Sequence, residues 1–241
     1  MKTIYIIGDS TSGVKYNPLI TGEKIGWAEL FHKYTKNSLC KVSNSCMPGH
    51  SLRDFFHRGI LNKIIDNAVP GDILMACHGS LEKAPLVREG DRARGSLFGS
   101  GEEIQIVWDE YFGRQEIVHT FGWYLKRLIK LSKDKGITLF LLSAPSRNDF
   151  REGMHHRSVS PKYARIMREI ALTNQVNFMD FNELTSRHLN AIGENVANTL
   201  FVNENGDKAH TNLSGADFYA KVAARELKIS FSEFNVLIQL D

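Results

Sequence analysis

The sequence contains little that would suggest a disulfide-stabilised or membrane-spanning protein. Its 241 residues include only three cysteines, and these lack the CxxC or zinc-ligand spacing: Cys40, Cys46 and Cys77. The apolar run 4–7 near the N-terminus is shorter than the roughly 7–15 residues of a signal-peptide core. No run approaches the ~20 residues of a membrane span. We therefore expect no membrane association and a cytoplasmic protein with reduced cysteines, or a secreted one if a leader has been removed from the sequence.

Strong charge of one sign is also missing. Lys and Arg number 30 against 27 Asp and Glu, which gives a net charge of +3, too little to indicate nucleic-acid binding. The sequence has no P-loop and no GxGxxG, and its aromatic residues fall on expected helix faces rather than between basic residues. We expect no nucleic-acid partner, no metal and no organic cofactor.

What the sequence does contain is an alternation of strand and helix patterns. Short β-branched or apolar runs predict five strands, at 3–7, 41–43, 73–77, 138–143 and 176–179. Helical spacing separates them, at 27–34, 52–67 with a break at Gly59, 121–135, 161–173, 182–191 and 214–227. Such alternation predicts one domain over 1–241, a flavodoxin-like three-layer α/β/α sandwich around a mostly parallel five-stranded sheet. The tail, at 236–240, alternates like a further strand.

Residues 79–116 do not follow this alternation. They are rich in charge and contain residues such as Glu82, Arg94 and Glu103. Few positions there suit a core, so we interpret the stretch as a long excursion. Long loops in compact domains are usually functional or disordered, and a merely solvated loop is an equally good interpretation.

Polar residues that follow the strands are the first candidates for chemistry, because ligands bind at the carboxyl ends of parallel strands. Gly8-Asp9-Ser10 closes the first strand, which places the Ser10 hydroxyl in the ligand crevice. Gly, Asp and Ser are also ordinary turn residues, so the tripeptide alone fits a plain strand-ending turn equally well.

A second candidate lies near the other end of the chain. Asp207 and His210 are three residues apart in a polar loop before the last helix. A nucleophilic serine needs a base, and the base needs a carboxylate that fixes its tautomer. Asp-x-x-His is common by chance, but together with Ser10 it predicts a Ser-His-Asp triad at one crevice.

With these two motifs the sequence resembles the SGNH (GDSL-like) hydrolases, and within them the rhamnogalacturonan acetylesterases. The resemblance extends from Ile4 to about Leu227 and implies that Ser10 is the nucleophile and that the Gly49 amide is an oxyanion donor. Ordered blocks carry it: Gly8-Asp9-Ser10-Thr11, Gly26-Trp27, Asn44, Gly49-His50-Ser51, Phe55, Arg92-Ala93-Arg94-Gly95, 99–103, Val118-His119-Thr120-Phe121, Tyr124-Leu125, Asp207, His210-Thr211 and Gly215-Ala216.

One block departs from the family pattern. Where the family has Gly-His-Asn-Asp, this chain has Cys77-His78-Gly79-Ser80. Gly79 therefore occupies the third oxyanion position without the asparagine side chain, and losing one such donor typically costs about 10²–10³ in rate. We expect slow turnover, which Gly79→Asn would raise. Three other side chains are candidates to fill the gap: Ser80, Asn148 and Asn44.

Other candidates are weaker. Ser51 lies in a sequence near a nucleophile elbow, but Arg53 replaces the elbow's final glycine. His155-His156 has no carboxylate at helical ligand spacing, so a solvated loop is the better interpretation. Cys77 has no neighbours that would activate a thiolate, which favours a buried cysteine.

We therefore expect a serine esterase that removes acetyl groups from an acetylated oligosaccharide or polysaccharide. Its catalytic groups would be Ser10, Asp207 and His210, and its oxyanion donors Ser10, Gly49 and Gly79. One alternative is a catalytically weakened sugar-binding or regulatory module with the same fold. A second is hydrolysis of lipid esters or thioesters, which the charged stretch 79–116 disfavours.

Overall fold

The computed structural model describes residues 1–13, 24–87, 94–110, 113–157 and 161–240. A five-stranded sheet lies at its centre, in the order β2-β1-β3-β6-β9 with every neighbouring pair parallel. The strands are β1 (Lys2–Gly8), β2 (Cys40–Asn44), β3 (Ile73–His78), β6 (Thr138–Ser143) and β9 (Asn177–Met179). All five predicted strands and the mostly parallel sheet are thereby confirmed.

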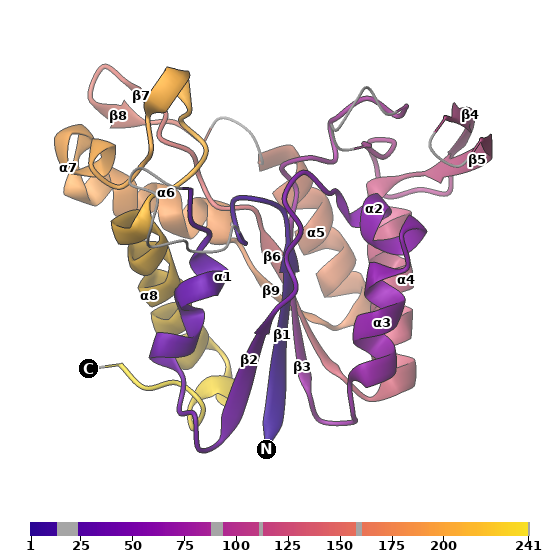
Figure 1. Ribbon diagram of the computed structural model, residues 1–241, viewed down its shortest axis with the longest axis horizontal. Coiled ribbons are helices and arrows are strands. Elements are labelled where there is room, and N and C mark those ends of the chain that lie inside the picture. The colour runs from indigo at the N-terminus through magenta and orange to yellow at the C-terminus, as the bar shows by residue number, and fades with distance from the viewer. Residues whose placement is uncertain (14–23, 88–93, 111–112, 158–160, 241) are drawn as a thin grey trace.

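The sheet is buried on both faces (Figure 1). In β1, Ile4 and Ile6 pack into one hydrophobic cluster and Ile7 into the other, because successive strand side chains point to opposite faces. One face is covered by α2 (Leu52–His57), α3 (Ile60–Asn67), α4 (Phe121–Lys135) and α5 (Pro161–Asn174), the other by α1 (Trp27–Leu30), α6 (Phe181–Ile192) and α8 (Leu213–Ser230). This is the expected α/β/α sandwich.

Capping explains both boundaries of α4. Thr120 accepts a hydrogen bond from the Trp123 amide at the start of α4, and Gly136 ends that helix with φ of 71°. The expected helix 27–34 divides into α1 and a 3-10 turn, Phe31–Tyr34. Ser160, the expected N-cap of α5, lies outside the described residues.

The prediction of a strand in the tail was wrong. A 3-10 turn, Ser232–Phe234, is followed by a single bridge between Ile238 and Thr35. Leu237 and Ile238 are both buried although they are consecutive, so the alternation seen in the sequence does not correspond to a strand with two faces. Two short elements were not predicted: the hairpin β7 (Phe150–Arg151) and β8 (Met154–His155), and helix α7 (Glu194–Asn198).

The charged stretch 79–116 was also misjudged as having few core positions. Its second half, with three residues beyond, forms the hairpin β4 (Ile104–Asp109) and β5 (Arg114–His119). Glu82, Arg94, Asp109 and Glu116 are each less than a tenth exposed. Arg94 pairs with Asp109 and Glu116, and Glu82 accepts backbone amides. The hairpin stands above the carboxyl end of the sheet, on the side of α2 and α4 (Figure 1).

Candidate active site

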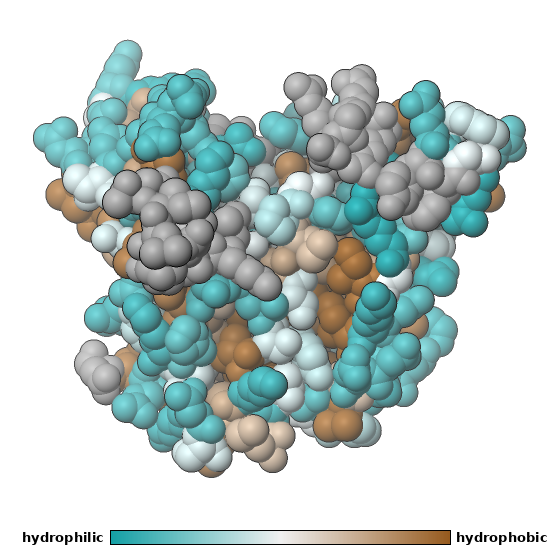
Figure 2. Space-filling model, viewed as in Figure 1, coloured by the Kyte–Doolittle hydropathy of each residue, from teal (hydrophilic) through white to brown (hydrophobic). Residues whose placement is uncertain are grey.

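The predicted triad lies at the carboxyl ends of the strands. The chain moves from β1 outward to β2 and then crosses to β3 on the other side of β1, so the order reverses beside β1. Ligands of open α/β sheets bind at such a switch point. Ser10 lies two residues beyond the end of β1. The carboxyl ends of the strands are at the top of the view in Figure 2, where the outline of the molecule dips between its two sides.

The three predicted groups form a continuous chain of hydrogen bonds. Ser10 Oγ lies 2.7 Å from His210 Nε2, and Asp207 Oδ2 lies 2.8 Å from His210 Nδ1. With Nδ1–H donating to the carboxylate, Nε2 accepts the Ser10 hydroxyl proton. This is the arrangement in which a histidine can deprotonate a serine.

Hydrogen bonds to the buried Asp9 fix the turn that carries Ser10. The buried Asp9 carboxylate accepts hydrogen bonds from the Thr11 amide and hydroxyl, at 2.8 and 2.6 Å. Its backbone carbonyl accepts the amides of Ser12 and Gly13. Gly8 is required because a Cβ there would lie 2.7 Å from the Cys77 carbonyl oxygen.

The Gly26-Trp27 pair joins the turn that carries Ser10, called the serine turn, to the loop that carries Asp207 and His210, called the histidine loop. The Trp27 indole donates to Ser12 Oγ at 3.2 Å. A Cβ at Gly26 would lie 2.1 Å from the Ser12 backbone, so only glycine fits. Next to it, Ile25 exchanges hydrogen bonds with Thr211, the residue after His210. The spacing between Ser10 and His210 is therefore held by one buried segment.

Asp207 is held in its charged form. Burial raises the pKa of its carboxyl, but the Lys24 ammonium at 2.6 Å, the Ala209 amide and His210 together hold this pKa well below its usual range. The carboxylate is consequently ionised throughout the neutral range and can stabilise an imidazolium at His210. Lys24 was not predicted, since no sequence pattern connects it to Asp207.

Two backbone amides are available as oxyanion donors. In the part of the chain that the structure describes, neither the Ser10 amide nor the Gly49 amide has an acceptor. The Gly49 loop is tethered to the first strand, because the Met47 amide donates to the Gly8 carbonyl at 2.8 Å. Gly49 has φ of 71°, in the left-handed region that favours glycine.

Gly79 does not present a donor. Its amide donates to Glu82 Oε2 at 2.8 Å, which commits it elsewhere. At φ of 111° a side chain is strained, and a Cβ would lie 3.2 Å from Tyr163 Cβ, directed toward α5. We therefore do not expect Gly79→Asn to raise the turnover rate, because the new side chain would be directed toward α5.

Two of the three side chains expected to replace the missing asparagine, Asn44 and Asn148, already donate hydrogen bonds to other residues. The Asn44 amide group donates to Glu29 at 2.9 Å, and that of Asn148 donates to Asn198 and Asn203. Ser80 remains. Its buried hydroxyl oxygen lies 3.5 Å from Arg147 Nη2, at the long end of hydrogen-bond range.

Arg147 was overlooked in the sequence. It follows β6, and the adjacent Asn148 amide donates to the Lys208 carbonyl at 2.8 Å, so its backbone runs beside the histidine loop. None of the carboxylates in the described segments pairs with its guanidinium. Within the described segments its positive charge is therefore not neutralised by an ion pair, and its guanidinium contacts Ser80.

The weaker candidates have structural roles. Ser51 is fully buried and caps α2. His155 is engaged at both ring nitrogens, by Ser186 Oγ and the Arg147 carbonyl. Burial raises the pKa of the Cys77 thiol, and Cys40, Cys46 and Cys77 are all unpaired. Across the described segments, no three His, Cys, Asp or Glu side chains group as metal ligands, and no helix is long and apolar enough to cross a membrane.

Buried charged groups, which sequence reasoning missed, support the Gly49 side of the crevice. Glu82 accepts the Leu52 amide at 3.1 Å as well as the Gly79 amide. Although burial raises its pKa, His78 and the backbone amides of Leu52 and of Glu82 itself bring the value below that of an ordinary glutamate. The carboxylate thus ties the end of β3 to the start of α2.

A larger group of buried charges lies behind α2; we call it the Arg53–Arg94 cluster. Arg53 Nε lies 2.6 Å from Glu116, and Arg94 contacts Asp54, Asp109 and Glu116. Burial lowers the pKa of Arg94, but the surrounding carboxylates raise it above its ordinary value. The cluster fastens β4 and β5 to α2. Arg92 and Ala93, from the same sequence block as Arg94, lie outside the described residues.

Two known proteins that resemble this chain in sequence carry esterase names. No protein-family model matches the chain. The uncharacterized esterase YxiM of Bacillus subtilis is 27% identical over 228 residues, which cover 94% of this chain and 52% of that protein. Its crystal structure superposes with a TM-score of 0.73 at 25% identity, covering 95% of this chain and 56% of that one. The chain therefore spans about half the length of this relative.

Two further proteins match over nearly their whole lengths. A probable rhamnogalacturonan acetylesterase of B. subtilis, YesY, is 24% identical over 227 residues, 93% of this chain and 92% of that protein. The chain has the SGNH hydrolase fold. A variant of Axe2, an acetylxylan esterase from Geobacillus stearothermophilus, shares this fold with a TM-score of 0.55 at 17% identity, over 96% and 95% of the two chains. The resemblance to SGNH hydrolases is confirmed.

Proposed function

We propose that this SGNH-fold protein is a serine esterase that removes O-acetyl groups from a carbohydrate. The observation that carries the proposal is the hydrogen-bonded series Asp207–His210–Ser10, with contacts of 2.8 and 2.7 Å, at the ligand-binding edge of the sheet. The esterase names of the relatives YxiM and YesY support it, and the second name supports an acetylated sugar as the substrate.

In the first half-reaction, Ser10 Oγ attacks the acetyl carbonyl carbon while its proton passes to His210 Nε2. The carbonyl oxygen becomes an oxyanion, for which the amides of Ser10 and Gly49 are the available donors. Asp207 stabilises the imidazolium. When the tetrahedral intermediate collapses, the bond to the sugar oxygen breaks, His210 gives that oxygen its proton, and an acetyl-Ser10 ester remains.

The second half-reaction repeats these steps with water. His210 Nε2 takes a proton from the water as its oxygen attacks the acetyl carbon. Collapse of the second intermediate breaks the bond to Ser10 Oγ, which regains the proton from His210. Acetate leaves, and the enzyme is restored without any redox change.

For the third donor, which Gly79 lacks, we propose the Ser80 hydroxyl. Arg147 is a pure donor, so its contact of 3.5 Å makes Ser80 Oγ the acceptor and leaves the Ser80 O–H to donate. The guanidinium charge would also polarise that hydroxyl and strengthen the bond it makes. Turnover then depends on two side chains where the family uses one asparagine.

Acetate release from a panel of acetylated oligosaccharides tests the proposed activity, with nitrophenyl acetate, butyrate and octanoate assayed beside them. We expect release from at least one sugar, a steep fall in rate from acetyl to octanoyl, and no activity in Ser10→Ala. A preference for octanoate would favour a lipid esterase or thioesterase instead. Sugar binding without hydrolysis by the wild type would favour the binding-module alternative, which the unusual Gly79 motivates.

A further inference from the structure

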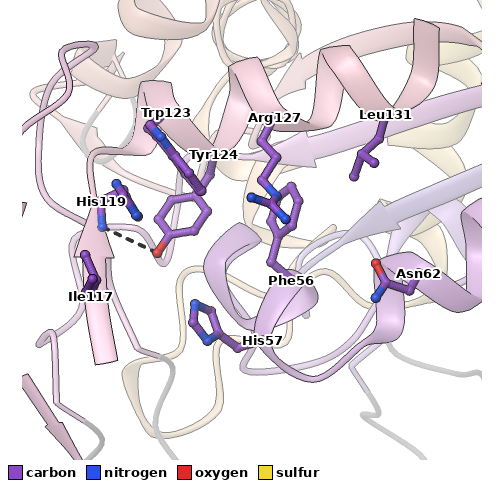
Figure 3. A pocket seen from close by; sticks show the side chains of 9 residues that line it. All are labelled: Phe56, His57, Asn62, Ile117, His119, Trp123, Tyr124, Arg127 and Leu131. Atoms are coloured by element: carbon purple, nitrogen blue, oxygen red, sulfur yellow. Dashed lines mark hydrogen bonds between the residues drawn. The ribbon is translucent and has the colours of Figure 1, made fainter. Parts of the chain in front are cut away.

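A separate cavity of about 270 Å³ lies on the flank of the molecule, between α2, α3, α4 and β5 (Figure 3). This volume lies just below the roughly 300–1,000 Å³ that is usual for ligand pockets, so the cavity suits a small ligand such as a single sugar ring. It contains none of the triad or candidate oxyanion residues. We call it the flank pocket, and its lining residues are Phe56, His57, Asn62, Ile117, His119, Trp123, Tyr124, Arg127 and Leu131.

Arg127 is the unusual member of this set. Its guanidinium carbon lies 5.8 Å from the centre of the Phe56 ring and 5.4 Å from that of Trp123, so two aromatic rings orient it. The lysines on either side of it along α4 each have a carboxylate, Lys126 with Glu102 and Lys130 with Asp134. For Arg127, the described part of the chain provides none, which leaves its N–H donors for a ligand.

The other polar walls of the flank pocket are neutral. Burial lowers the pKa of His119 and that of His57, although the Glu116 carboxylate 3.0 Å from His57 Nε2 opposes the shift, so burial disfavours the charged form of both rings. His119 stacks on Trp123 with centroids 3.7 Å apart, and its buried Nδ1 has no hydrogen-bond partner within the described residues. One fixed cation, one unsatisfied ring nitrogen and the exposed Asn62 amide suit a ligand with one negative charge and additional hydroxyl groups.

An apolar ribbon continues from the pocket. On the outer face of the β4–β5 hairpin, Ile106 is paired with Ile117, which lines the pocket, and Trp108 is paired with Gln115, one step along the same face. Ile106, Trp108 and Ile117 are each at least half exposed. The C–H faces of a sugar pack on such aromatic and aliphatic surfaces, while a planar carboxylate matches a guanidinium fork.

We propose that the flank pocket is a second binding site, for a sugar that carries a carboxylate, such as a uronic acid. The carboxylate pairs with Arg127, and the ring lies against Ile117 and the aromatic wall. Further sugar units of a longer chain extend over Trp108. This binding goes beyond the proposed esterase activity and does not use Ser10.

Titration of the Ser10→Ala protein with sodium glucuronate, glucose and inorganic phosphate tests the site without any catalysis. The indole N–H resonance of Trp123, assigned through Trp123→Phe, reports on the pocket. We expect glucuronate to shift it and to bind at least about tenfold more tightly than glucose, as expected for a charge-assisted hydrogen bond. Arg127→Met should abolish this preference, whereas Arg225→Met, at an exposed arginine of α8, should not.

Four results would overturn the proposal. Equal affinity for glucose and glucuronate, or unchanged glucuronate affinity in Arg127→Met, would remove the carboxylate contact. Phosphate binding as tightly as glucuronate would mean a bare anion site. A dimer in sedimentation experiments that Trp108→Ala dissolves and glucuronate does not disturb would mean that a second copy of the chain covers the ribbon. None of these results bears on ester hydrolysis, which needs Ser10.

Discussion

Two groups of ionisable side chains in this protein are built in opposite ways. The side chains of His210 and Asp207 remain 20% and 15% exposed, and a substrate can reach them. The side chains of Arg53, Arg94 and Glu116 are at most 5% exposed, and each is occupied by partners from another part of the chain. The first group can exchange a proton with a ligand, whereas the second is closed and can only hold β4 and β5 in place.

The comparison shows that charge density in a sequence does not distinguish a solvated loop from a core. The stretch 79–116 looks hydrophilic because a count of charged residues treats Arg94 and its acidic partners as separate, solvated groups. Together they neutralise most of each other's charge and can be buried. Such a cluster is sensitive to the loss of any member, because the groups that remain are left charged without water.

The largest effect we predict concerns the open group. Ser10→Ala should lower kcat for ester hydrolysis by about 10⁴–10⁶, because the nucleophile is lost. The free energy of unfolding should change by less than about 1 kcal/mol, since Ser10 is partly exposed and mainly contacts His210. Steady-state kinetics and urea unfolding measure the two quantities. An active variant would refute the proposed nucleophile.

For the buried Arg53–Arg94 cluster we expect the opposite, namely that a substitution lowers stability strongly. Arg94→Met leaves Asp54, Asp109 and Glu116 buried without their shared cation, and we expect it to cost about 3–5 kcal/mol of unfolding free energy. Arg187→Met is the matched control, because its pair with Glu183 is exposed and should contribute no more than about 0.5 kcal/mol. Equal effects in chemical denaturation would show that the buried cluster is not a structural unit.

The Ser80–Arg147 contact lies between these extremes, because it is only partly buried. Ser80→Ala and Arg147→Met should each lower kcat about 10- to 100-fold with little change in KM, since an oxyanion donor acts in the transition state. The double variant should be no slower than the slower single one. Arg151→Met, at an exposed arginine in the same region, is the control. If the two losses in kcat are additive, or if only KM changes, Ser80 is not an oxyanion donor that Arg147 polarises.

The smallest effect concerns pH. Because the pKa of Asp207 is depressed in the folded protein, its carboxylate stabilises the fold above its ordinary pKa near 4, and this contribution is lost as the pH falls further. The difference in unfolding free energy between wild type and Asp207→Asn should therefore shrink, by on the order of 1 kcal/mol, between pH 5 and pH 2.5. A constant difference would mean that Lys24 and His210 do not hold the charged form.

Much of the fold was predictable from local pattern. Strand β6 was predicted with its observed bounds because it is an uninterrupted apolar run, and Gly136 ends α4 as a C-terminal glycine should. The hairpin β4–β5 was not predicted, since its outer face carries Ile106 and Trp108 in solvent and its inner face carries Glu116. Val107 and Val118 are also buried on the inner face, so apolar and charged residues occur on both faces and a period of two marks no single apolar face.

The site divides in the same way. Ser10 and the Asp207/His210 pair could be found because each lies in a short motif, and the parallel topology places both at one edge. Lys24 and Arg147 could not, because each acts on a residue distant in the sequence, and neither could Glu82, because it joins Gly79 to the distant Leu52. The role expected of Gly79 failed for a backbone reason, since its amide is turned toward Glu82 by a conformation that the sequence does not specify.

The hydrogen bond between Ser10 and His210 joins residues 200 positions apart. During synthesis the serine turn leaves the ribosome long before its base, and at ~5–20 residues per second the delay is about 10–40 s. Over that interval the nascent chain has a serine hydroxyl but nothing to deprotonate it. The esterase we propose would therefore become active only when the segment leading into α8 docks against Ile25, so that a truncated or incompletely folded chain carries no hydrolytic activity.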